Sequence, residues 1–201
     1  MTNVSVDIID LLIGAGVDRA SRLEALRARR PVTRQQAQQS YLTLFQPGST
    51  DDASLSERFA VAAFVSGLHG DAAAASHYAG LLSTVGGGGA LAPVVDQAAA
   101  AATGRGPYGH FPLGPLNAED QAGPIYRVDR GEADILGPRL VAALEHAHLL
   151  VFHPRDSNPA ALRRLVDAGW STTGIVTLSQ LVSFLAFQLR VVSGLRTLIA
   201  A

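Results

Sequence analysis

The chain has 201 residues, with 16 basic and 17 acidic side chains, a formal net charge of −1 and no cysteine. Without a thiol, the chain cannot be a thiol peroxidase, a disulfide relay, a thiolate–metal protein or a small disulfide-stapled secreted fold. The near-neutral charge gives no electrostatic reason to expect binding to nucleic acid or to an anionic membrane. A chain of this length buries roughly 70% of its unfolded surface when it folds, which is enough for a full core in one domain.

Composition and the first residues also bear on the compartment. All basic residues are Arg and Ala is abundant, which suggests a GC-rich bacterial genome. The start of the chain has no positively charged segment, and Asp7 and Asp10 interrupt its apolar run, so no export signal is expected. The strongest membrane candidate, Ile175–Leu189, has 15 residues, contains polar side chains and is shorter than the roughly 20 residues that span a bilayer. We therefore expect a soluble, cytoplasmic bacterial protein.

Helical periodicity and helix-end signals predict an all-α chain. Two capping boxes, Thr33-x-x-Gln36 and Ser54-x-x-Glu57, predict helix starts near residues 34 and 55. Asp71 and Asn158 are further N-cap candidates, and a first-turn proline follows Asn158. The ranges expected to be helical are 8–13, 21–30, 34–45, 55–69, 72–85, 93–103, 140–151, 159–168 and 175–199.

The last of these helices, 175–199, is apolar nearly all round. A helix of this kind is buried on more than one side. One small domain has difficulty in covering both sides, so we expect part of the helix to lie at a subunit interface. The protein is therefore predicted to be a homo-oligomer whose contacts include the C-terminal helix.

The stretch SLSERFAVAAFVSGLHGDAAAASHYAGLL, residues 54–82, has the outline of a redox active-site helix pair. It resembles the alkylhydroperoxidase D / carboxymuconolactone decarboxylase family of peroxidase-related proteins. That family typically shows a Glu early in the first helix, then a Gly, a C-x-x-C pair, and a His four residues after the second Cys. The alignment rests on Leu68-His69-Gly70, which matches the family's Leu-Asn-Gly.

The same alignment shows that every residue of the family's peroxidase chemistry is replaced. Asp71 and Ala74 stand at the two cysteine positions. Phe59 falls at the Glu position and Tyr78 at the His position, with His77 just before it. The chain is thus similar to a branch of the family that lacks the C-x-x-C redox motif.

The C-terminal segment is similar to the family's usual ending, a helix–turn followed by a long apolar helix and an Arg before a Gly-Leu. The matching residues are Ala168-Gly169-Trp170-Ser171, Ile175-Val176 and Phe187-Gln188-Leu189-Arg190-Val191-Val192-Ser193-Gly194-Leu195. With the first motif, the likeness covers residues 36–103 and 136–201. The resemblance implies an alkylhydroperoxidase D-like helical domain that assembles as an oligomer.

We expect a single domain over residues 1–201, with a first helical half at 36–103 and a C-terminal helical half at 139–201. Between them, residues 104–138 contain seven Gly and five Pro and show no periodicity. Such a long irregular segment is usually a lid, a binding loop or an arm. Two interpretations are open. In one, an arm packs on another subunit through Tyr108, Phe111, Leu113, Ile125 and Tyr126; in the other, a substrate lid carries Arg105 and His110.

His69, Asp71 and His77 are the candidate catalytic residues, because an imidazole beside a carboxylate is a normal proton-transfer unit. In the family this helix junction carries the reactive cysteines, so it is expected to open into a pocket. Structural roles compete with catalysis, since Asp71 is a helix cap and the histidines are explained equally by solvent or core hydrogen bonds. Glu57 lies near the family's Glu position, but it points to the opposite face of its helix and its capping box explains it.

His146, His148 and His153 invite a metal interpretation. On a helix, His146 and His153 share a face while His148 is turned about 200° away. The three converge only if a helix end lies between them, and no metal or cofactor site is predicted.

The glycine run 86–89 is neither a dinucleotide fingerprint nor a phosphate-binding loop and is expected to be a flexible connector. Arg155-Asp156 is expected to form a local ion pair or a loop anchor.

Three functions are open at this point. The first is a non-peroxidase member of the family that keeps the pocket for binding or structural work. The second is an enzyme that uses His69, Asp71 and His77 for proton transfer on a small carbonyl or lactone substrate, because the family's decarboxylase branch runs non-thiol chemistry on the same scaffold. The third is an inactive companion subunit of a cysteine-bearing relative.

Overall fold

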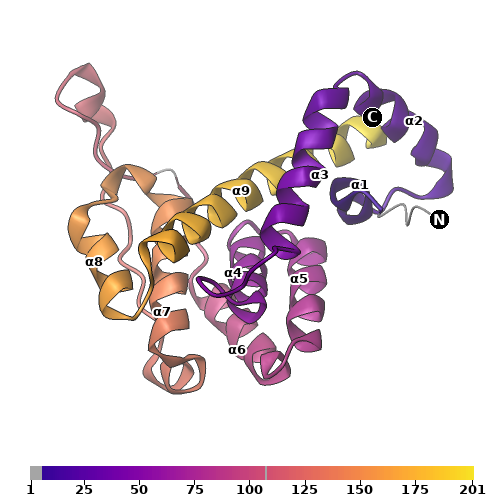
Figure 1. Ribbon diagram of the computed structural model, residues 1–201. Helices are drawn as coiled ribbons and strands as arrows, with labels where there is room; N and C mark the ends of the chain where they lie inside the picture. The colour runs from indigo at the N-terminus through magenta and orange to yellow at the C-terminus, as the bar shows by residue number, and fades with distance from the viewer. Residues whose placement is uncertain (1–5, 107) are drawn as a thin grey trace.

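The computed structural model describes residues 6–106 and 108–201, and in them the chain is all-α, as the sequence predicts (Figure 1). The described residues form nine α-helices and two short 3₁₀ helices, with one isolated β-bridge between Gly109 and Gln121 and no strand. The α-helices are α1 (Ile8–Ile13), α2 (Val17–Ala28), α3 (Pro31–Phe45), α4 (Leu55–Leu68), α5 (Ala72–Thr84), α6 (Gly88–Ala101), α7 (Arg130–Phe152), α8 (Pro159–Asp167) and α9 (Thr172–Ala200). The 3₁₀ helices are η1 (Pro115–Glu119) and η2 (Pro154–Asp156).

The 29-residue helix α9 crosses the whole molecule and organises the fold (Figure 1). Its N-terminal part packs beside α7 and α8, its middle beside α4, and its C-terminal part beside α1, α2 and α3. Different helices of the same chain therefore cover different sides of α9 along its length. These contacts bury much of the apolar surface of α9, although Val176, Phe187 and Leu198 remain exposed.

Helix α4 lies in the core, where ten of its fourteen residues are buried. Its N-terminus is the predicted capping box: the Ser54 hydroxyl accepts the N–H of Glu57 (3.2 Å), and the Glu57 carboxylate accepts the N–H of Ser54 (2.8 Å). Helices α5, α6, α7 and α9 all pack against α4. A helix covered on every side needs small and apolar residues all round, which explains its weak amphipathic pattern.

Helices α2, α3, α6, α7 and α9 begin three to ten residues before the predicted starts, and the reason is clear at α3 and α6. Helix α3 begins at Pro31 and not at the Thr33 capping box, because a first-turn proline already has a helical φ and has no N–H that needs a partner. Helix α6 begins at Gly88, inside the glycine run that was expected to be a flexible connector. That run is instead a tight turn: a Cβ at Gly88 would lie 1.9 Å from the Leu82 carbonyl oxygen, so only glycine fits.

The irregular segment is shorter than predicted, because α7 begins at Arg130 and residues 130–136 are helical, before the non-helical Gly137. The Asp129 side chain caps this helix by accepting the N–H of Gly131 (2.8 Å). Gly137, with φ of +77°, and Pro138 form a kink inside α7 and do not mark its start. The remaining loop projects from the molecule beside α7 and α8 and carries η1 (Figure 1).

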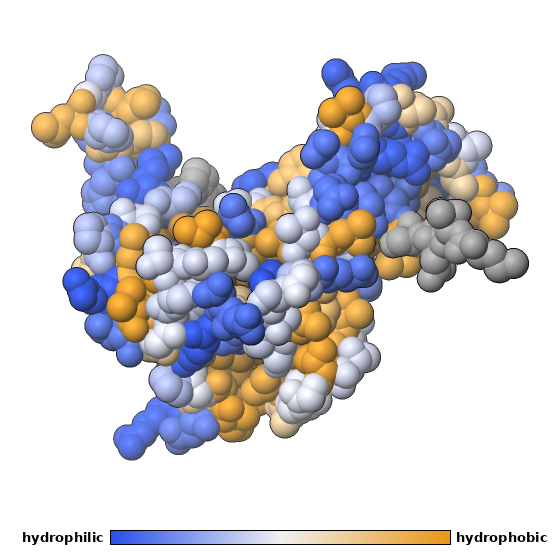
Figure 2. Space-filling view, viewed as in Figure 1, coloured by the Kyte–Doolittle hydropathy of each residue, from blue (hydrophilic) through white to orange (hydrophobic). Residues whose placement is uncertain are grey.

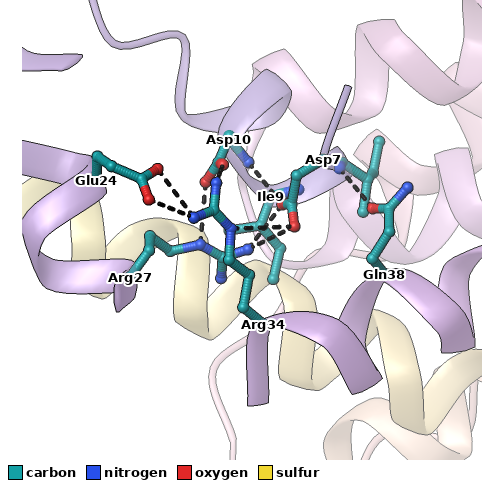
Figure 3. A network of polar contacts seen from close by, with 8 residues as sticks. Asp7, Ile9, Asp10, Glu24, Arg27, Arg34 and Gln38 are labelled. Atoms are coloured by element: carbon teal, nitrogen blue, oxygen red, sulfur yellow. Dashed lines mark hydrogen bonds and ion pairs between the residues drawn. The ribbon is translucent and has the colours of Figure 1, made fainter. Parts of the chain in front are cut away.

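The three N-terminal helices are held together by a network of ion pairs (Figure 3). Arg27 on α2 donates to both carboxylate oxygens of Asp7 (2.7 Å each), which also caps α1. Arg34 on α3 binds Asp10 on α1 (2.7 Å) and Glu24 on α2 (2.8 Å). Arg27 is only 6% exposed, so its charge is satisfied by these carboxylates and not by water. The network fixes α1, α2 and α3 around the C-terminal part of α9.

Polar and apolar residues are unevenly distributed over the surface of the protein. Polar residues cover α2 and α3, whereas apolar residues gather over α5 and α6 on the same face of the molecule (Figure 2).

Two described helices, α7 and α9, are long and apolar enough to cross a membrane by length and composition, and in each 44% of the most apolar stretch is buried in the fold. Core helices of soluble proteins meet the same criterion, and both helices here pack against several others.

Candidate functional site

The junction between α4 and α5 opens into a cavity of about 550 Å³, on the side where α9 passes. Gly70, with φ of +69°, turns the chain between the two helices. Asp71 then caps α5 by accepting the N–H of Ala74 (3.0 Å), as the sequence predicts. The cavity is lined by His69, Gly70, Asp71, Ala72, Ala73, Leu189, Arg190, Ser193, Arg196 and Thr197.

Asp71 is held by an arginine and not by a histidine. Its second carboxylate oxygen lies 2.8 Å from Nη1 of Arg196, and the Asp71 side chain is only 9% exposed. The other terminal nitrogen of Arg196 donates to the carbonyl of Leu12 at the end of α1. Arg196 therefore connects α1, α5 and α9, and it neutralises the carboxylate that the sequence suggested as a partner for a histidine.

His69 is fixed in one tautomer. Its Nδ1 lies 2.9 Å from the carbonyl oxygen of Val65. A carbonyl only accepts hydrogen bonds, so Nδ1 carries the proton and Nε2 has a free lone pair. Burial, and to a smaller extent the charge of Arg190, lower the pKa of His69. The side chain is thus a neutral imidazole in the cavity wall near pH 7.

His77 does not join His69 and Asp71 and is absent from the residues that line the cavity. It lies six residues after Asp71, which is about 240° round α5. Its ring packs edge-on against Tyr78, with ring centroids 5.1 Å apart, and burial lowers its pKa. The structure therefore brings together two of the three predicted residues, and the angle between residues 71 and 77 on a helix already indicates this.

Phe59 and Tyr78, which the resemblance would set at the family's Glu and His positions, belong to an aromatic stack in the core. Phe45 lies between Phe59 and Tyr78, with ring centroids 5.5 and 5.1 Å away. Ala74, at the second cysteine position, is fully buried. The hydroxyl of Tyr78 donates to the side-chain oxygen of Gln188 on α9 (2.6 Å). This part of the junction is filled with packed side chains and offers no reactive group to a ligand.

Sequence reasoning missed the contribution of α9 to this site. Arg190, Ser193 and Thr197 are three and four residues apart, and Arg196 directly precedes Thr197, so all four lie on one side of the helix. In the sequence, Arg190 stands out only as part of the C-terminal segment that is similar to the family. The spacing predicts a polar stripe, but no pattern in the sequence says that this stripe faces the α4–α5 junction.

Helix α7 ends at Phe152, so His153 lies just outside the helix that carries His146 and His148. The ring centroids of His148 and His153 lie 6.1 Å apart, whereas His146 is buried elsewhere, and neither of its ring nitrogens has a hydrogen-bond partner among the described residues. The expected shared face of His146 and His153 is therefore wrong, because His153 leaves the helix with φ of −146°. No group of three or more potential metal ligands occurs among the described residues.

Arg155 and Asp156 anchor the loop, as the sequence predicts. Arg155 donates to the carbonyl of Tyr108 (3.2 Å) and lies over the ring of Phe111, 3.8 Å from its centroid. Asp156 accepts the backbone N–H of His110 (3.0 Å). These contacts hold the base of the projecting loop against the end of α7.

Comparison with known proteins adds no relative. No known protein family, curated protein or solved structure matches this chain. The likeness to the alkylhydroperoxidase D family therefore rests on the residues of the two motifs alone.

Proposed function

We propose that the protein is a non-peroxidase binding protein, and that its cavity at the α4–α5 junction takes a small anionic molecule such as phosphate or a carboxylate. The observation that carries this proposal is the charge balance of the cavity. Among the described residues, the one carboxylate of the lining, Asp71, is paired with Arg196, and Arg190 has no acidic partner. A cavity with net positive charge and hydroxyl groups favours an anion.

The first turn of α5 adds to this preference. Asp71 accepts the N–H of Ala74, whereas the backbone N–H groups of Ala72 and Ala73, two residues that line the cavity, have no partner among the described residues. These groups lie at the positive end of the helix dipole. Ser193 on α9 supplies a hydroxyl donor to the lining, whereas the hydroxyl of Thr197 already donates to the carbonyl of Ser193 (3.1 Å). The arrangement suits an oxyanion better than a cation or an apolar molecule.

Titration with inorganic phosphate and with succinate, followed by calorimetry, tests this function. Arg190→Gln is expected to weaken binding about tenfold, because one charge-assisted hydrogen bond is lost. Asp71→Asn is expected to strengthen binding, since Asn caps a helix about as well as Asp and the charge of Arg196 is released. Arg163→Gln removes an equal charge from the exposed face of α8 and serves as the control. Equal affinities in all four proteins, or no binding at millimolar anion, would refute the proposal.

An enzyme remains the alternative, in which His69 is the general base. The neutral, hydrogen-bonded imidazole of His69 and the nearby N–H groups of α5 support proton transfer on a small carbonyl or lactone substrate with stabilisation of developing negative charge. His69→Gln would then abolish turnover while leaving anion affinity nearly unchanged. A loss of anion affinity in this variant without any measurable turnover in the wild type would favour the binding function. An inactive companion of a cysteine-bearing relative would instead be recovered with that relative in a pull-down from the native host.

We further propose that the chain is an alkylhydroperoxidase D-like helical domain and forms a homo-oligomer. Val176, Phe187 and Leu198 on α9 are exposed, and residues 72–101 carry a single charged side chain, Asp96. Light scattering at micromolar concentration is expected to give a mass above the 21.0 kDa of one chain. Phe187→Glu should lower that mass, whereas Val17→Glu, at an exposed apolar position on α2, should not. A monomeric wild type would contradict the proposal.

A further inference from the structure

A second cavity, of about 350 Å³, lies between the base of the projecting loop and the end of α7. Its volume is in the range of small-molecule sites. Its walls come from residues 110 and 122–127 of the loop, from α7, from η2 and the turn that follows it, and from α8. The cavity is separate from the α4–α5 junction, and the two share no lining residue.

One wall of this cavity carries two histidines that share a carboxylate. Asp156 lies 3.2 Å from Nδ1 of His153 and 3.0 Å from Nδ1 of His110. Burial opposes ionisation of Asp156, but the hydrogen bonds from His110 and His153 outweigh it and hold the pKa of this carboxyl below its ordinary value. An ionised carboxylate only accepts, so each Nδ1 carries a proton, and in a neutral imidazole Nε2 is then the acceptor.

His153 is the better placed of the two bases. Its side chain is 7% exposed, whereas that of His110 is 65% exposed at the rim. Gly123 packs against the imidazole ring of His153, and a Cβ at residue 123 would come within 2.6 Å of that ring. Gly109, with φ of +116°, lets the backbone approach Asp156. The loop is thus shaped around the His153–Asp156 pair, which is how a positioned proton acceptor is held.

The rest of the cavity is mostly apolar. Tyr126 stacks on His148, with ring centroids 5.0 Å apart, and Ile125 and Leu149 complete this side. Burial lowers the pKa of His148 to about 4, so its ring is uncharged near neutral pH. A flat, apolar ligand would therefore meet flat, uncharged surfaces here.

In the described part of the chain, the charged side chains that line this cavity include one cation without a carboxylate partner. Glu145 is paired with Arg127 (3.1 Å), and Asp156 is engaged by the two histidines. Arg164 on α8 also lines the cavity and has no carboxylate partner among the described residues. The cavity thus combines a proton acceptor, an apolar wall and a cation at its edge.

We propose that this second cavity binds a small aromatic molecule with an acidic hydroxyl, a phenol or an enol, and takes its proton. In this step the O–H bond breaks, the proton goes to Nε2 of His153, and the electron pair stays on the ligand oxygen as an oxyanion. Asp156 stabilises the imidazolium, and Arg164 offsets the negative charge on the oxyanion. No further reactant is needed, because the site exchanges one proton with its ligand.

The test uses 4-nitrophenol, whose phenolate is yellow and whose neutral form is colourless, at a pH below the pKa of the free phenol. Addition of the wild-type protein is expected to raise the phenolate absorption. His153→Gln should abolish this rise, and Asp156→Asn should weaken phenolate binding about tenfold. Arg164→Gln alters an exposed side chain, so it tests the site even if the buried variants fail to fold.

Arg190→Gln separates this inference from the proposed anion site. If the phenolate binds in the second cavity, this variant gives the wild-type signal. If Arg190→Gln abolishes the signal, the phenolate binds at the α4–α5 junction and the inference is wrong, although the proposed anion site is then supported. A wild type that gives no rise in phenolate absorption at millimolar probe, or a rise that survives both His153→Gln and Arg164→Gln, also refutes it.

Discussion

His146 should make this protein sensitive to mild acid. The residue is 5% exposed, and neither ring nitrogen has a hydrogen-bond partner within the described part of the chain. Burial, together with the nearby charge of Arg164, lowers its pKa from 6.5 to about 4. The folded state therefore holds His146 neutral at pH values where the unfolded chain takes up a proton.

The size and sign of the effect follow from this difference in pKa. Because the folded pKa is below the unfolded value, the stabilisation is complete above pH 6.5 and is lost as the pH falls towards about 4. The free energy of unfolding should drop by about 2 kcal/mol between pH 7.5 and pH 5.0 through His146 alone, and by roughly 3 kcal/mol at pH 4. Such a loss is a large fraction of the roughly 5–15 kcal/mol that stabilises a typical domain.

Urea unfolding at pH 7.5 and pH 5.0 measures this effect when wild type is compared with His146→Leu and His146→Gln. Both variants lack a titrating group, so each should lose about 2 kcal/mol less than the wild type between the two pH values. His146→Leu should also be about 1 kcal/mol more stable at pH 7.5, because it removes a buried polar group without partners. His146→Gln keeps a polar side chain and should show no such gain. If the three proteins lose the same stability between the two pH values, His146 is not buried in the neutral form.

Three further outcomes are expected. Tyr78→Phe should cost about 1–3 kcal/mol, because the side-chain oxygen of buried Gln188 loses its donor; adding Gln188→Met should recover most of that loss in thermal unfolding. Ser54→Ala should lower the unfolding free energy by about 1 kcal/mol through loss of the cap on α4, and an unchanged denaturation midpoint would argue against the cap. The purified protein should show no thiol-dependent reduction of hydroperoxides, since it lacks a thiolate nucleophile. Turnover above buffer in a metal-free, dithiol-supported assay would contradict this last expectation.

Local signals in the sequence were sufficient for the helices and for most of their ends. Ser54, Asp71 and Asn158 cap helices as predicted, because a capping side chain bonds to backbone groups only two or three residues away. The prediction failed at Thr33, where Pro31 starts the helix two residues earlier. It also failed at the glycine run 86–89, where the close packing of Gly88 on Leu82 decides the conformation. At both helix starts, the local geometry of Pro31 or Gly88 decided the first helical residue, and the capping box or the glycine run did not.

The candidate sites depend on contacts that no local pattern contains. Asp71 meets Arg196 across 125 positions of the chain, and Tyr78 meets Gln188 across 110. Periodicity shows that α9 has polar and apolar stripes, but it does not say which helix each stripe faces. His110 and Asp156 likewise meet only because the loop folds back on the end of α7. The sequence by itself determined an all-α, cysteine-free chain and the caps of its helices, whereas the tertiary structure decided which side chains share a cavity, because packing joins residues that the chain keeps far apart.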